Sequence, residues 1–182
     1  MRLIALLSQF CSLLAAQPAG VMPDWEVRAA AAGIEKHTRT VAELLTHLQP
    51  EDWVANGAPV AYLEQLKQAR LLNGYLAQEA QALARQPEKL SVALDTFLRL
   101  DHLQSLLDSL SAGAREYQDS SLGDNLLRAT SQNSTTRERL KEYIRQLAGE
   151  REQEWEIANR EAQRCRENLS KTPAAAPATK PK

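Results

Sequence analysis

Residues 121–169 read SLGDNLLRATSQNSTTRERLKEYIRQLAGEREQEWEIANREAQRCRENL, and their pattern is the clearest indication of an α-helical fold. Apolar and small residues recur along it at intervals of four and three, the spacing that places side chains on one face of an α-helix. A single helix over residues 120–169 would be about 75 Å long at 1.5 Å per residue. The expected seam of this helix consists of Leu122, Leu126, Ala129, Asn133, Thr136, Leu140, Tyr143, Leu147, Arg151, Trp155, Ala158, Ala162, Cys165 and Leu169.

A second interpretation divides the same stretch into two helices. The break would fall at residues 131–136, where Thr135 and Glu138 have the spacing of a capping box for a new helix. We favour the continuous helix because the seam does not change phase. Such a helix would outreach neighbours of about 40 Å, so its second half must protrude, bend or meet a partner.

Three shorter helices are expected before this stretch, over about residues 24–49, 59–86 and 88–117. Prolines and turn residues mark their ends, because proline begins helices readily and rarely continues them. Between the first two helices, residues 50–59 (PEDWVANGAP) carry turn residues at both ends and predict a loop.

The sequence therefore predicts an all-α fold, an antiparallel bundle of about four helices with a long C-terminal helix. Seven glycines and abundant Leu, Ala, Gln, Glu and Arg favour helix over strand. The connection Gln86-Pro87-Glu88 is short enough to make its two helices antiparallel neighbours. The third helix has the widest apolar face, and we expect its Leu94, Phe97 and Leu107 to be fully buried.

Both ends of the chain differ from the bundle domain, which we expect to occupy residues 20–169. Residues 1–19 begin with Met1-Arg2, continue with an apolar run and end in small residues, the order found in a secretory signal peptide. Residues 170–182 form a tail rich in Pro, Ala and Lys, whose composition predicts disorder. We therefore expect an exported bacterial protein, periplasmic or secreted.

The sequence lacks the common catalytic and cofactor motifs. It has no Cys-x-x-Cys-His, Glu-x-x-His or His-Glu-x-x-His, no glycine-rich phosphate loop and no Gly-x-Ser-x-Gly. We accordingly expect no enzymatic activity and no cofactor. The net charge is −1 and no segment is strongly basic, so we expect no nucleic-acid partner. The N-terminal apolar run is too short to span a bilayer, and we expect no transmembrane segment in the mature chain.

The three histidines are the only candidates for a metal site or ligand site. His37 and His47 are ten residues apart and would point in different directions on one helix. A cluster would need His102 to face them from another helix. Solvent-facing positions beside the apolar stripe explain the histidines more simply, and we expect that arrangement.

Five residues are candidates for partner binding: Trp53, Trp155, Ala158, Ala162 and Cys165. Trp53 either caps the end of the bundle or anchors a partner from an exposed loop. Trp155 interrupts an acidic run, and the two alanines would let a facing helix approach closely. Cys165 is expected to pack as a small apolar residue in the seam. A bridge between two chains, or a thiol made reactive by the neighbouring arginines, is the alternative.

The charges around this seam also allow two interpretations. Between Arg137 and Glu167 there are eight acidic and eight basic residues. They form either a solvated face with ion pairs one turn apart or the flank of a coiled coil that binds another helix.

The apolar N-terminus, the helical pattern and the segment HLQPEDWVANGAP at residues 47–59 together resemble small exported bacterial helical proteins of unassigned function. The architecture is also similar to periplasmic helical chaperones, although their repeated cradle motifs are absent here. We expect a non-enzymatic interaction or scaffold protein that binds a protein partner or itself through amphipathic helices. A periplasmic chaperone or adaptor that holds client segments is one alternative, and a bundle that binds a metal or small ligand is the other.

Overall fold

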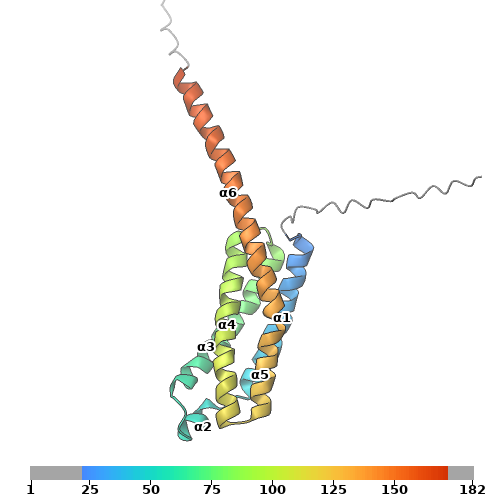
Figure 1. Ribbon diagram of the computed structural model, residues 1–182, viewed down its shortest axis with the longest axis vertical. Coiled ribbons are helices and arrows are strands. Elements are labelled where there is room, and N and C mark those ends of the chain that lie inside the picture. The colour runs from blue at the N-terminus through green and yellow to red at the C-terminus, as the bar shows by residue number, and fades with distance from the viewer. Residues whose placement is uncertain (1–21, 172–182) are drawn as a thin grey trace, which may run out of the picture.

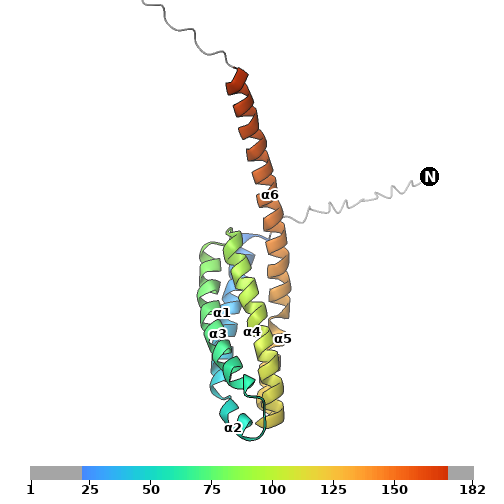
Figure 2. The same cartoon turned by 90° about the vertical axis from the view of Figure 1, so that its left-hand side faces the viewer.

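The computed structural model describes residues 22–171 and contains only helices within that range. In chain order the helices are α1 (Asp24–Thr46), α2 (Pro50–Ala55), α3 (Ala61–Arg85), α4 (Leu90–Tyr117), α5 (Ser120–Gln132) and α6 (Ser134–Lys171). The helices α1, α3, α4 and the α5–α6 arm run alternately down and up, and each packs against its neighbours in the chain (Figure 1, Figure 2). The arm also contacts α1, which closes the bundle. The expected antiparallel all-α bundle is confirmed.

Leucine and alanine side chains fill the interior along the whole bundle. Their spacing of three and four residues gives each helix one buried face. In α4 this face lies elsewhere than expected: Leu107 is fully buried, but Leu94 is exposed and Phe97 only partly buried. The helix α4 carries apolar side chains on several of its own sides. The side that packs against the neighbouring helices is the one with the small residues Ala93 and Thr96.

The segment expected to be a loop between the first two long helices contains a short helix, α2. Pro50 occupies its first turn, where the missing N–H leaves no helical hydrogen bond unmade. The helix ends at Ala55, and Gly57 follows it with a φ of 96°, a conformation that favours glycine. The prediction of a plain loop over residues 50–59 was therefore wrong.

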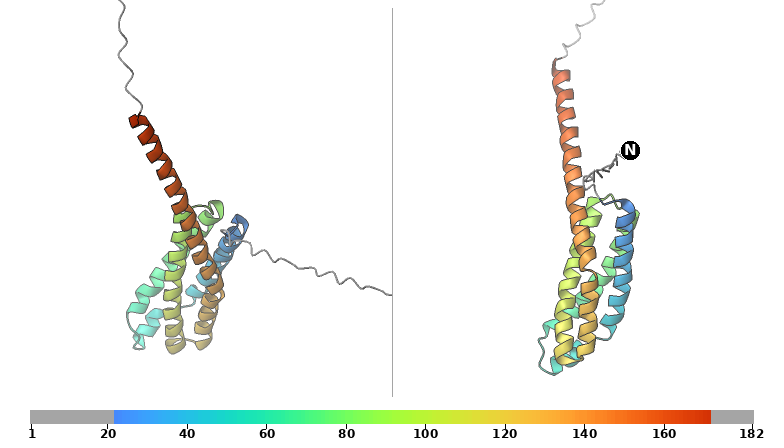
Figure 3. Two further views of the ribbon diagram at one scale, coloured as in Figure 1. Left: turned by 45° about the horizontal axis from the view of Figure 1, so that its top comes forward. Right: turned by 45° about the vertical axis from the view of Figure 1, so that its right-hand side comes forward.

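The long C-terminal segment is interrupted at a single residue, Asn133, between α5 and α6. The backbone resumes the helix at once, since the N–H of Arg137 donates to the carbonyl of Asn133 over 2.9 Å. Figure 3 shows that α6 continues upward from α5. The prediction of one continuous helix over residues 120–169 was wrong. The interruption occurs within residues 131–136, where the alternative interpretation placed a break. The seam nevertheless keeps its phase across it, with Asn133 and Leu140 both buried.

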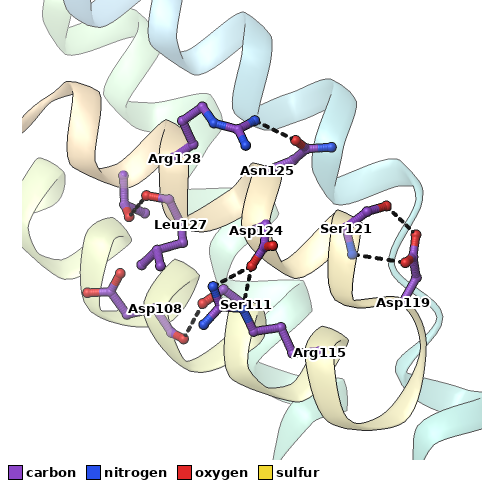
Figure 4. A network of polar contacts seen from close by, with 10 residues as sticks. Asp108, Ser111, Arg115, Asp119, Ser121, Asp124, Asn125, Leu127 and Arg128 are labelled. Atoms are coloured by element: carbon purple, nitrogen blue, oxygen red, sulfur yellow. Dashed lines mark hydrogen bonds and ion pairs between the residues drawn. The ribbon is translucent and has the colours of Figure 1, made fainter.

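Polar contacts fix the turn between α4 and α5 (Figure 4). Asp119 caps α5 by accepting a hydrogen bond from the backbone N–H of Ser121 over 2.9 Å. The hydrogen bond from the Ser121 hydroxyl, together with this backbone bond, lowers the pKa of the Asp119 carboxyl. Arg115 of α4 forms an ion pair with Asp124 of α5. At Gly123 a Cβ atom would lie 2.6 Å from a carbonyl oxygen of α4, so only glycine permits this approach. These contacts set the direction in which α5 and then α6 travel.

The expected signal peptide (1–19) lies outside the described residues, as does the tail from residue 172 onward. The helix α6 extends to Lys171, slightly past the expected end of the bundle domain at 169.

Candidate interaction site

The bundle ends where α6 loses its last contacts with the α3–α4 connection. The hydroxyl of Tyr143 donates to the carbonyl of Pro87, and burial raises the pKa of this phenol. Leu147, one turn later, is still buried. Arg151 then donates to the carbonyl of Glu88 over 3.4 Å. These contacts fix the direction of the helix as it leaves the bundle.

The rest of α6, residues 150–170, projects away from the bundle (Figure 1, Figure 2), and we call it the projecting segment. Every residue in it is exposed except Asn159, which is intermediate. Trp155 is 67% exposed, Ile157 50% and Leu169 76%, large values for such apolar side chains. The prediction that the second half of this helix outreaches its neighbours is confirmed.

Four of the five residues expected to bind a partner lie on the projecting segment. They are Trp155, Ala158, Ala162 and Cys165, all exposed. At about 100° per residue they fall on one side of the helix, together with Leu169. The expectation that Cys165 packs inside a seam was wrong, because no other helix within residues 22–171 covers this part of α6. The seam residue Leu147 belongs to the bundle and not to the uncovered surface.

The fifth residue, Trp53, lies at the opposite end of the molecule and is fully buried. Its ring stands edge-on to Tyr62, with ring centroids 5.4 Å apart. Its indole N–H donates to the side-chain oxygen of Gln118 over 2.9 Å, and the same side chain donates to the carbonyl of His47 over 2.8 Å. Trp53 therefore caps the bundle, and it is not available as an exposed anchor.

The histidines do not converge. His47 and His102 are exposed, whereas His37 is buried and desolvation lowers its pKa to about 4. Among residues 22–170, no group of three or more His, Cys, Asp or Glu side chains is placed to hold a metal ion. The expectation that His37 faces solvent was wrong. Its position three residues after Ile34 and four before Val41, both buried, is the signal that places it on the core face.

A small polar pocket of about 250 Å³ lies beside His37, where α1 faces the interruption between α5 and α6. Lys36, Thr40 and Thr136 line it, and so does Asn133, whose side-chain N–H group is buried without a partner in the described structure. The lining offers hydrogen-bond donors for a small polar molecule. None of the residues that line it carries a carboxylate.

Comparison of the sequence and the structure with known proteins finds no matching protein family, no matching curated protein and no matching solved structure. No helix between residues 22 and 171 combines the length and the apolar character needed to cross a membrane. The exposed apolar side chains of the projecting segment make it the strongest candidate site on physical grounds.

Proposed function

We propose that this chain is a non-enzymatic, exported interaction or scaffold protein, and that it binds a protein partner or a second copy of itself through the projecting segment. The observation that carries the proposal is the exposure of Trp155 and its neighbours on the part of α6 that the bundle does not cover. The bundle serves as a rigid base, and the segment extends about 30 Å beyond it at 1.5 Å per residue.

The energetic argument concerns the apolar stripe. Apolar surface left in water costs about 25 cal/mol per Å² relative to its burial. Trp155 and Leu169 are each more than half exposed, and Ala158 and Ala162 extend the stripe between them. A second helix laid along this side would bury all four side chains. Tryptophan is also the residue type most enriched among the dominant contacts of protein interfaces.

The chaperone or adaptor alternative is supported by a different surface. A shallow, mostly apolar hollow lies on α3 and α4, where Leu71, Tyr75 and His102 form part of its lining. Leu71 and Tyr75 are about half exposed. A chaperone would suppress the aggregation of many unfolded clients through this hollow, whereas a scaffold would bind few partners through α6. Replacement of Leu71 by Glu separates the two, because it should impair only the chaperone.

The proposal is tested by placing a photo-crosslinking amino acid at position 155 in cells that make the protein. We expect discrete crosslinked products, whose masses identify the partner. Position 25 is the matched control, since Trp25 is 68% exposed but lies on α1 of the bundle. Equal and negligible crosslinking at both positions would contradict the proposed function.

Export is tested separately from partner binding. N-terminal sequencing of the protein from the cell envelope should begin between Gln17 and Val21. An intact Met1 on protein confined to the cytoplasm would contradict export and leave the crosslinking result to decide the interaction.

A further inference from the structure

The projecting segment separates its charges along its length. Residues 150–156 contain four acidic side chains and one basic side chain, whereas residues 160–166 contain three basic side chains and one acidic. The one arginine of the acidic part, Arg151, forms a salt bridge with Glu154 over 2.6 Å. Within the described chain, Arg160, Arg164 and Arg166 form no salt bridge, and the bundle supplies no acidic group to them.

We propose that two copies of this chain associate through their projecting segments, which pair side by side in antiparallel orientation. This inference rests on the proposed function, since it names the partner of the same surface. Antiparallel pairing places the acidic part of each segment beside the basic part of the other. Parallel pairing would place acidic beside acidic and basic beside basic, which is unfavourable.

The apolar stripe fits one antiparallel register. In that register Ala158 faces the partner's Ala162 at the centre, where two small side chains let the helices approach closely. Trp155 then faces the partner's Cys165, so a large side chain meets a small one. Leu169 lies against the aliphatic stem of the partner's Arg151, whose guanidinium can stay at the surface. Every position of the stripe has a partner.

The same register brings specific charges together beside the stripe. A two-fold axis across the pair makes each flank of one helix face the same flank of the other. On one flank Glu152 lies near the partner's Arg166, and the symmetry repeats this attraction. On the other flank the two Glu161 side chains meet close to the axis and repel each other. The attraction and the repulsion both give tests of the register.

The length of the segment suits this arrangement. When the centres of the two segments coincide, the end of one helix near residue 170 comes level with residue 150 of the other, where the bundle begins. The two bundles lie at opposite ends of the pair and do not collide. The paired length of about 30 Å gives an interface at the small end of the specific range, so the dimer should be weak and concentration-dependent.

Sedimentation equilibrium of the purified full chain tests the pairing, with Cys11→Ser as the parent so that Cys165 is the only thiol. We expect a monomer–dimer equilibrium that Trp155→Glu abolishes. Trp25→Glu, the same change at an equally exposed tryptophan of the bundle, should leave it intact. A chain that stays monomeric up to about 1 mM, a concentration at which even a weak specific interface forms detectable dimer, would overturn the pairing.

Charge reversal tests the register. Glu152→Arg and Arg166→Glu should each raise the dissociation constant about tenfold, because each turns two attractions into two repulsions. The double variant should restore dimerisation, and Glu161→Gln should strengthen it. Gln153→Glu, on the outer face of the same helix, is the control and should have little effect. Failure of the double variant to recover would contradict the register.

Oxidation of Cys165 tests the orientation. In the antiparallel register the two Cys165 residues are about 15 Å apart along the axis, too far for a disulfide. A parallel pair would bring them face to face. We expect a dimer that copper-catalysed oxidation does not link covalently, and rapid linkage would overturn the antiparallel pairing. If the chain is monomeric but position 155 crosslinks to a different protein in cells, the pairing is wrong and the proposed function stands.

Discussion

Trp53 and Trp155 lie near opposite ends of the molecule, each on a helix with acidic neighbours. Trp53 is fully buried, hydrogen-bonded to Gln118 and packed edge-on against Tyr62. Trp155 is 67% exposed on the part of α6, residues 150–170, that no other described element covers. The local sequences around them are alike, and the difference comes from the topology. One end of the bundle is closed by a short helix, while at the other end one helix continues past the bundle.

The largest expected effect that tests this contrast is the removal of the buried indole. Trp53→Ala should lower the free energy of unfolding by about 3–5 kcal/mol, because it opens a cavity and leaves Gln118 with one bond fewer. Trp155→Ala should change it by less than about 0.5 kcal/mol in the monomer. Urea denaturation followed by circular dichroism measures both. Similar losses for the two variants would show that the ends do not differ as described.

Two histidines differ in the same way as the two tryptophans, since His37 is buried and His47 is exposed. Burial lowers the pKa of His37 from 6.5 to about 4. In the unfolded chain, His37 therefore binds a proton below about pH 6.5, whereas in the folded chain it binds one only below about pH 4. Stability is retained above this window and falls through it as the pH drops, by as much as about 3 kcal/mol.

The variant His37→Gln should remove this part of the acid sensitivity, measured as the difference between denaturation curves at pH 7 and pH 4.5. His47→Gln is the matched control, because His47 is exposed on the same chain segment. The carboxylates titrate in all three proteins, so only the difference between variants reports on His37. Equal acid sensitivity of all three would contradict the burial of His37.

Periodicity predicts the features of this fold that depend on local sequence. The long helices, the antiparallel order and the projecting second half of α6 follow from spacing and length alone. Features that depend on tertiary contacts were missed. The helix α2 is too short to be stable alone, and Trp53 holds it against the bundle. Leu94 and Phe97 were placed in the core because nothing local distinguishes the buried side of a helix that is apolar on several sides.

The candidate site was predictable only in part, because some of its features depend on local sequence and others on tertiary contacts. Trp155, Ala158 and Ala162 were identified from the excess length of their helix, a property that sequence conveys. The same excess length leaves Cys165 uncovered, so its expected packing was a wrong interpretation of the seam. The point where the bundle ends, just after the buried Leu147, could not be located from sequence. That point is set by the turn after α3, where Pro87 accepts the hydrogen bond from Tyr143.

The smallest expected effect is also the most direct test of whether the bundle is stable without the projecting segment. Deleting residues 152–182 should shift the melting temperature by no more than about 2 °C at low protein concentration, because surface changes in a domain of this size cost about 0.5 kcal/mol or less. Arg151 and its bond to Glu88 remain in this variant. Deleting residues 141–182 is the control, since it removes the buried Tyr143 and Leu147 and should lower the melting temperature by many degrees. If the shorter deletion also lowers the melting temperature by several degrees, the segment contacts the bundle and its apolar stripe is buried within one chain. If the melting temperature falls only at high protein concentration, the deletion has removed the stability that association adds, as pairing through this segment requires.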